Sequence, residues 1–181
     1  MSYSLANRKS VLKWEITGFF FIVVVGSLLH FVFEWTGRLE WVALFAAVNE
    51  SIWEHLKLAF FPSFIFALIE YPFIRNKVKN FSVAKTLSFY VMPLVIVVLF
   101  YLYLIIFRKD SLFWDIFIFV VSIGIGQIVS YKVLVSKELS KTVRSIFKVL
   151  FLVILIAFLF FTYLPPHNFL FKDPISGRYG L

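Results

Sequence analysis

Long apolar runs, separated by short basic segments, dominate this chain. The runs at about 14–35, 84–107, 112–134 and 146–164 are each close to the ~20 residues that a helix needs to cross the hydrocarbon of a bilayer. Charged residues make up only 15% of the chain, too few to cover a soluble globule, and the hydrophobic fraction is 61% against roughly 45–50% in soluble domains. We therefore predict an all-α integral membrane protein whose surroundings are a lipid bilayer.

A fifth apolar region, 41–74, would measure ~51 Å as one helix, which is too long for a single crossing. Ser51 and Glu54 have the spacing of a capping box, which predicts a helix start at that point. We therefore expect a short re-entrant or interfacial helix at about 40–49, followed by a span over 51–74. The alternative is one long, tilted helix.

These runs predict a helical bundle of five transmembrane helices plus the short helix, over residues 1–164. Residues 165–181 form a tail in which His and Asp alternate with aromatic residues, a composition unlike that of a disordered segment. We expect this tail to be external and to fold back as a lid over a cleft.

The distribution of Lys and Arg gives an orientation. Most of them lie in the N-terminal segment, the 75–85 loop and the 132–148 connection, which five spans place on one side. By the positive-inside rule the N-terminus is cytoplasmic and the C-terminus external. The net charge of +8 is thereby explained by topology and anionic headgroups, so we expect no nucleic-acid partner. The chain has no cysteine, which excludes disulfides and thiolate metal sites.

The most polar stretch next to an apolar run is 49–57. It places an amide, two carboxylates, an imidazole and an ammonium within nine residues, contributed by Asn49, Glu50, Glu54, His55 and Lys57. Ionisable groups so close to lipid are costly, and they mark functional sites more often than ordinary surface does.

The predicted topology brings further polar groups to the same side of the membrane. All three histidines fall on the external side, together with seven of the ten acidic residues, namely Glu34, Glu40, Glu50, Glu54, Asp110, Asp115 and Asp173. The orientation was derived from Lys and Arg alone, so this clustering is an independent indication of an external polar site.

Carboxylate and imidazole groups at such a position are typical ligands of zinc or a similar divalent metal ion. His30 and Glu34 are four residues apart, as are Glu50 and Glu54, so each pair shares a helix face. The predicted metal ligands are His30, Glu34, Glu50 and His55, with His167 or Asp173 completing the site from the tail.

Two further residues of the 49–57 stretch suit catalytic roles. Glu54 is a candidate ligand or general base for a metal-bound water, and Lys57 is a candidate for steadying a developing negative charge or binding an anionic headgroup. Neighbouring helix residues point ~100° apart, so Glu54 and His55 share an ion only if the helix start is distorted. The site predicts a metal-dependent hydrolase acting on a lipid or amphiphilic substrate at the outer membrane surface.

Other interpretations of the same residues stay open. Glu54 and Lys57 are also spaced for an ordinary ion pair on a helix. The carboxylates would equally serve as a cation site in a small transporter or channel subunit, or as packing residues in an interaction subunit of a membrane complex. Deeper in the apolar runs, we expect Glu70 to pair with Arg75, and Gln127 to hydrogen-bond a neighbouring helix.

Three segments together carry a resemblance. They are His30-x-x-x-Glu34, the stretch 49–57 read as Asn-Glu-Ser-x-Trp-Glu-His-x-Lys, and the Pro-Pro-His and Gly-x-Tyr-Gly elements of the tail. This combination resembles a family of small, uncharacterised, multi-spanning bacterial membrane proteins. The resemblance implies a bacterial plasma membrane location and a shared polar site at these positions, and it supplies no reaction.

Overall fold

The computed structural model describes residues 5–108 and 111–181 and is all-α, with one short 3₁₀ helix. The five α-helices are each long and apolar enough to span a membrane. Their bounds are α1 Leu5–Trp35, α2 Ile52–Ile74, α3 Phe81–Phe107, α4 Leu112–Leu134 and α5 Lys141–Tyr163. The ranges predicted from the apolar runs agree closely, except that α1 and α5 begin several residues earlier, in polar sequence. Lys109 and Asp110, expected in the turn before α4, lie outside the described residues.

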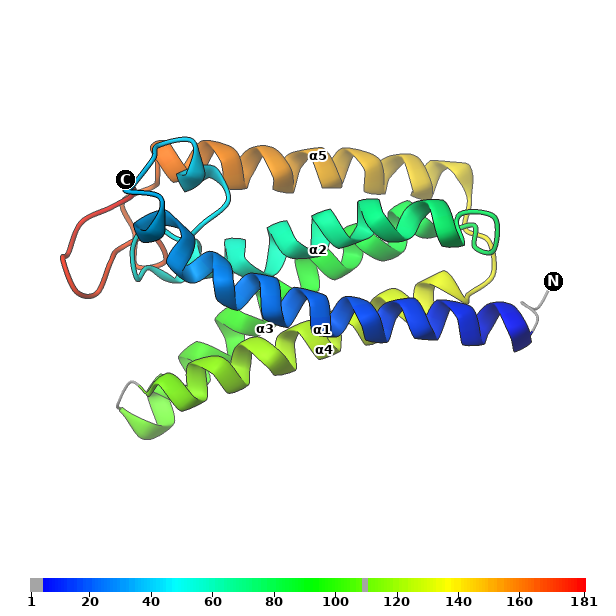
Figure 1. The fold of residues 1–181 in the computed structure, drawn as a ribbon, viewed down its shortest axis with the longest axis horizontal. Coiled ribbons are helices and arrows are strands. Elements are labelled where there is room, and N and C mark those ends of the chain that lie inside the picture. Colours follow the sequence, from blue (N-terminus) through cyan, green and yellow to red (C-terminus); the bar gives the residue numbers. More distant parts are fainter. Residues whose placement is uncertain (1–4, 109–110) are drawn as a thin grey trace.

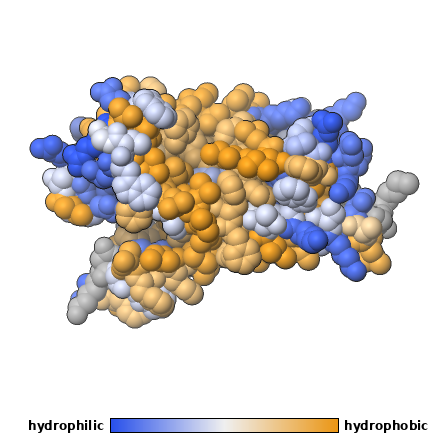
Figure 2. All heavy atoms as spheres, in the orientation of Figure 1, coloured by the Kyte–Doolittle hydropathy of each residue, from blue (hydrophilic) through white to orange (hydrophobic). Residues whose placement is uncertain are grey.

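The helices run along the long axis of an elongated bundle, and the start of α1 and the C-terminus lie at opposite ends of it (Figure 1). On the face shown in Figure 2, apolar side chains form a broad belt across the middle, and hydrophilic residues gather towards both ends. We call the end that carries the 36–51 loop and the tail the loop end. The belt is the surface expected of a bundle whose helices face lipid.

Helix α2 is the central element of the bundle. Of its most apolar 18-residue window 61% is buried, against 17–28% for the other four helices. Phenylalanine rings fill the space around it: Phe60 packs against Phe89 of α3 at 5.3 Å and Phe158 of α5 at 4.6 Å between ring centroids. Phenylalanine rings thus pack α3 and α5 against α2 through edge-on and tilted ring contacts.

Helix α1 meets α2 at a glycine. A Cβ atom added at Gly26 would overlap the backbone carbonyl oxygen of Leu58, so only a residue without a side chain fits there. Small residues allow such close approach between membrane helices. Because His30 lies one turn after Gly26 and His55 lies three residues before Leu58, this contact also sets the distance between the two histidines.

The 36–51 loop differs from its prediction. It contains a single turn of 3₁₀ helix, Val42–Leu44, in place of a longer helix over 40–49. The alternative of one long helix from 41 to 74 is also wrong, because α2 begins at Ile52. The Ser51 side chain accepts from the Glu54 amide at 3.4 Å, as in a capping box, but the Glu54 carboxylate accepts from Val48 instead of closing that motif.

Asn80 joins the α2–α3 turn to the α4–α5 connection at the opposite end. Its side chain is fully buried, it donates to Val133, Ser136 and Lys137, and it accepts from the amide of Leu139. One amide group therefore ties the turn to several atoms of the connection, including the backbone amide of Leu139 and the backbone carbonyl of Lys137.

We expect Asn80→Ala to lower the free energy of unfolding by about 2 kcal/mol, since the hydrogen bonds of the buried Asn80 side chain to the Lys137 carbonyl and the Leu139 amide would be lost. Chemical denaturation in detergent, followed by circular dichroism, measures this change. The exposed Asn76 supplies the control, because its replacement by alanine should stay within about 0.5 kcal/mol. Equal effects of the two substitutions would contradict the role given to Asn80.

Candidate metal site

His30, Glu50 and His55 converge at the loop end. Each offers one ligand atom, and the three atoms lie within 4.8 Å of one another. The two Nε2 atoms of His30 and His55 are 3.2 Å apart, and the Glu50 Oε2 atom is 3.7 Å from the first and 3.4 Å from the second. Three groups that are 20 and 5 residues apart in sequence thus form one cluster, which we call the His–Glu cluster.

Three different elements position these side chains. His30 lies near the end of α1, His55 lies in the first turn of α2, and Glu50 is in the loop just before the Ser51 cap. The close contact of α1 and α2 at Gly26 brings the two imidazoles together, and the helix cap fixes where the loop delivers Glu50.

The orientation of His55 is set by a backbone carbonyl. Its Nδ1 atom lies 2.9 Å from the Ser51 carbonyl oxygen, which can only accept, so Nδ1 carries the proton. The Nε2 atom then faces His30 and Glu50. In the protonated ring Nε2 donates to Glu50, and in the neutral ring it is the unprotonated nitrogen that a metal ion would bind. Metal-binding histidines are oriented in the same way, by donating the other ring N–H to a carbonyl or carboxylate.

Glu50 is suited to be a charged ligand. Its hydrogen bond with His55, aided by the charges of both histidines, lowers the pKa of Glu50 below its ordinary value against the opposing effect of burial. The carboxylate is therefore ionised at neutral pH, as a metal ligand must be.

The spacing within the His–Glu cluster matches a tetrahedral ion. Two ligand atoms bound to one tetrahedral zinc ion at about 2.0–2.2 Å lie roughly 3.3–3.6 Å from each other. The observed separation of 3.4 Å falls within this range, and those of 3.2 and 3.7 Å lie just outside it. The 3.2 Å separation of the imidazoles also suits a direct hydrogen bond donated by His30. Three protein ligands of this type are the number found in catalytic zinc sites, where water takes the fourth position.

The side chains of the His–Glu cluster are accessible. His30 and His55 are each 33% exposed and Glu50 is 44% exposed, so solutes at the loop end can reach them. The His–Glu cluster differs in this exposure from the ionisable groups that are buried inside the bundle.

Glu54 and Lys57 form a buried ion pair next to the cluster. Lys57 Nζ lies 2.5 Å from Glu54 Oε2 and donates to the Ala43 carbonyl at 2.7 Å, while Glu54 accepts from the Val48 amide. Both residues are at most 1% exposed. Their polar atoms thus contact each other and the 36–51 loop. Neighbouring helix residues point ~100° apart, so the His55 side chain points away from this pair, towards His30 and Glu50.

The remaining predicted ligands do not join the three. Glu34 is exposed and binds Arg38, one turn further on, at 2.8 Å. His167 stacks on Tyr179 in the tail, with ring centroids 4.5 Å apart. Asp173 lies closer to the His–Glu cluster, because it accepts a hydrogen bond from the backbone amide of Glu50. Burial raises the pKa of Asp173, but the hydrogen bonds from Ser176 and from backbone amides outweigh it and hold this pKa below its ordinary value.

The tail is attached to the start of α2. The Trp53 amide donates to the Leu170 carbonyl at 3.0 Å, and the Trp53 ring packs on Phe171 at 4.6 Å. Asn49 donates from its side chain to the Gly180 carbonyl at 2.8 Å. These contacts hold residues 168–180 beside the loop that carries Glu50, so the tail forms part of the surroundings of the His–Glu cluster.

One acidic residue outside the His–Glu cluster lies within electrostatic range of it. Asp115, in the first turn of α4, lies near enough for its charge to act on His55. The sequence predicted Asp115 on the external side together with the other acidic residues. Its sequence separation from His30 and His55, however, does not indicate that the start of α4 lies near α1 or α2.

Comparison with known proteins gives a family match only. No curated protein and no solved structure matches the chain. A family model does match, over residues 1–181, and its description is "Family of unknown function (DUF6512)". The chain therefore belongs to the DUF6512 family, whose function is not known.

Proposed function

We propose that this protein is a metal-dependent membrane hydrolase whose zinc or similar divalent ion is held by His30, Glu50 and His55. The observation that carries the proposal is the separation of the three ligand atoms, 3.2, 3.4 and 3.7 Å, which suits one tetrahedral ion. An ion with three protein ligands supplies a bound water of lowered pKa, the nucleophile of metal-assisted hydrolysis.

The proposal places the loop end at the outer surface of a bacterial plasma membrane, with the N-terminus cytoplasmic and the C-terminus external. The excess of Lys and Arg at the opposite end supports this orientation through the positive-inside rule. The His–Glu cluster then lies at headgroup level, which favours a lipid or amphiphilic substrate.

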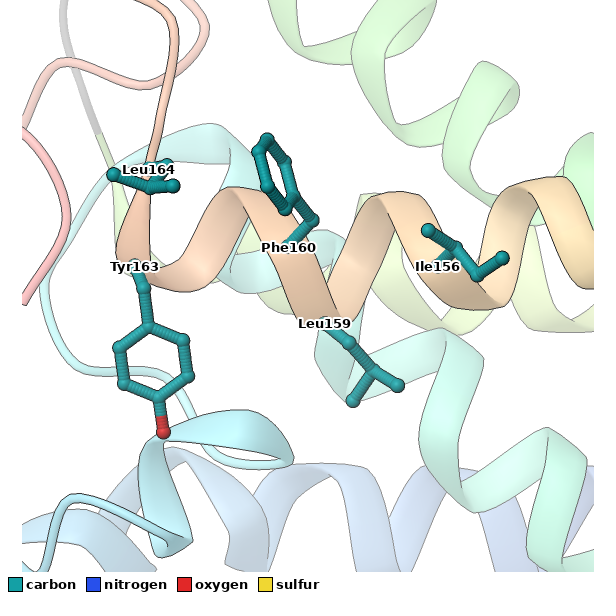
Figure 3. A pocket seen from close by; sticks show the side chains of 5 residues that line it. All are labelled: Ile156, Leu159, Phe160, Tyr163 and Leu164. Carbon is teal, nitrogen blue, oxygen red and sulfur yellow. The ribbon is translucent and has the colours of Figure 1, made fainter.

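The apolar surface near the end of α5 is compatible with that substrate class. It is open and is formed by side chains of this one helix and its C-cap, namely Ile156, Leu159, Phe160, Tyr163 and Leu164 (Figure 3). The Tyr163 hydroxyl donates to the Glu40 carbonyl at 2.9 Å, so this surface adjoins the 36–51 loop.

In this proposal Glu54 and Lys57 are positioning residues. They hold the 36–51 loop through Val48 and Ala43, and thereby the placement of Glu50, and they do not meet the substrate. Asp173 supports Glu50 through its backbone amide.

Metal analysis tests the proposal. Protein purified in detergent, stripped with a chelator, reloaded with zinc and dialysed should retain one ion per chain by elemental mass spectrometry. His55→Ala and Glu50→Gln should each lose it, while Glu34→Gln should retain it, because Glu34 pairs with Arg38. Loss of metal in none of these variants, or no retained metal in the unmodified protein, would exclude the site.

Activity is tested separately in vesicles of defined phospholipids. Zinc-loaded protein should release hydrolysis products, detected by mass spectrometry, and His55→Ala should release none. Bound metal without hydrolysis, together with cation flux into the vesicles, would replace the hydrolase proposal with a transporter.

A further inference from the structure

A second polar cluster lies deep in the other half of the bundle. Glu15 of α1, Glu70 of α2 and Lys85 of α3 meet there, with exposures of 2%, 0% and 5%. Lys85 Nζ lies 2.7 Å from Glu15 Oε1 and 2.5 Å from Glu70 Oε2. We call these residues the Glu–Lys–Glu triad. The predicted pair of Glu70 with Arg75 is wrong, because Glu70 contacts Lys85 and Arg75 is exposed.

The groups around the triad are neutral. From α4, Ser130 donates to Glu15 Oε1 at 2.8 Å and Gln127 donates to the Glu15 backbone carbonyl at 2.9 Å, which is the interhelical role expected of Gln127. The face of the Phe81 ring lies 5.7 Å from Lys85 Nζ. Within residues 5–108 and 111–181, α5 adds no ion pair to the triad.

The charges of the triad do not balance when all three groups are ionised. One ammonium compensates one of two carboxylates that lie within about 5 Å of each other, since both contact the same nitrogen. Among the described residues, neither Glu15 Oε2 nor Glu70 Oε1 has a hydrogen-bond partner. An uncompensated buried carboxylate is strongly unfavourable, and two neighbouring carboxylates in such a site do not both ionise.

We propose that the Glu–Lys–Glu triad binds one exchangeable proton, shared by Glu15 and Glu70. Binding forms one O–H bond to a carboxylate oxygen and breaks one O–H bond of a solvent hydronium ion, which leaves as water, and it makes the triad neutral. The two carboxyl groups then titrate as a pair instead of one residue carrying the proton permanently.

Glu15 lies beside an open groove between α1 and α4. The groove has a volume of about 270 Å³, and most of its lining is apolar, with Gln127 and Tyr131 as further polar neighbours. The proton site is also separate from the His–Glu cluster, because Glu15 and His30 are 15 residues apart on α1, or about 22 Å.

Infrared spectroscopy of the full chain in lipid vesicles tests the proposal without any substitution. At neutral pH a C=O stretch of a protonated carboxyl group should be present, should shift in heavy water, and should shift again when the protein contains carboxyl-labelled glutamate. It should disappear as the pH is raised. Absence of a protonated glutamate band, or its removal by sodium ions at constant pH, would overturn the proposal; the second outcome would indicate a metal-cation site.

Variants then assign the band. Glu70→Gln and Glu15→Gln should each abolish it, because the remaining carboxylate is neutralised by Lys85. Lys85→Met should double its intensity, because both carboxyl groups must then be protonated. The control is Glu138→Gln, which removes an exposed partner of Arg144 and should leave the band unchanged. A band retained in both glutamine variants of the triad would overturn the assignment.

Discussion

Lys57→Met is expected to lower the free energy of unfolding by about 3–5 kcal/mol, the cost of leaving one partner of a buried ion pair uncompensated. The substitution keeps the volume of the side chain but removes the ammonium that contacts Glu54, the Ala43 carbonyl and the Thr162 hydroxyl. Thr162 belongs to α5, so the same change also weakens the attachment of α5 to α2. Denaturation in detergent, followed by circular dichroism, measures the loss.

A double variant distinguishes an uncompensated charge from lost packing. Lys57→Met combined with Glu54→Leu removes both charges, so it should be more stable than Lys57→Met alone, and the cycle of the four proteins yields the coupling energy. It should remain below the unmodified protein, because Val48 and Ala43 lose their partners. A double variant no more stable than the single one would contradict the proposed origin of the effect.

Gly26→Ala is expected to reduce zinc affinity by about 10–100-fold, a range typical of changes that disturb ligand orientation. The new Cβ atom would overlap the Leu58 carbonyl oxygen, so α1 must move away from α2 and carry His30 away from His55. Titration with zinc against a chelator of known affinity measures the change. The stability of the bundle should fall as well, although alanine is the better helix former.

Gly124→Ala is the matched control. It makes the same substitution in a bundle helix, but the nearest atom to its Cβ, on the Phe19 ring, is at 3.6 Å, an ordinary contact. Zinc affinity should be unchanged and stability equal or higher. If both alanine variants bind zinc like the unmodified protein, the contact at Gly26 does not set the spacing of the histidines.

The helices were predictable because an apolar run of bilayer length has few other stable structures. The Ser51 cap was likewise predictable from local spacing. The loop was not: a helix over 40–49 follows from hydropathy, whereas the chain forms one 3₁₀ turn there, held by the partners of Glu54 and Lys57. Those partners are tertiary contacts with loop residues, and no residue spacing within 49–57 specifies them.

The members of the site were predicted only in part. His30, Glu50 and His55 lie together, but helix spacing alone also included Glu34, which points to Arg38. The Glu–Lys–Glu triad joins residues up to 70 positions apart, and Glu15 is a single acid in an apolar run. Which helix faces meet decides such contacts, and that depends on close approaches such as the one at Gly26.

The position of Gly180 has a practical consequence for anyone producing this protein. Its carbonyl accepts from Asn49, its backbone has a positive φ, and a Cβ there would crowd Pro165 and the Thr162 carbonyl. An affinity tag fused after Leu181 would begin two residues beyond Gly180, close to the loop that carries Glu50. Purification handles and fluorescent fusions therefore belong ahead of α1, whose first residues lie at the far end of the molecule (Figure 1).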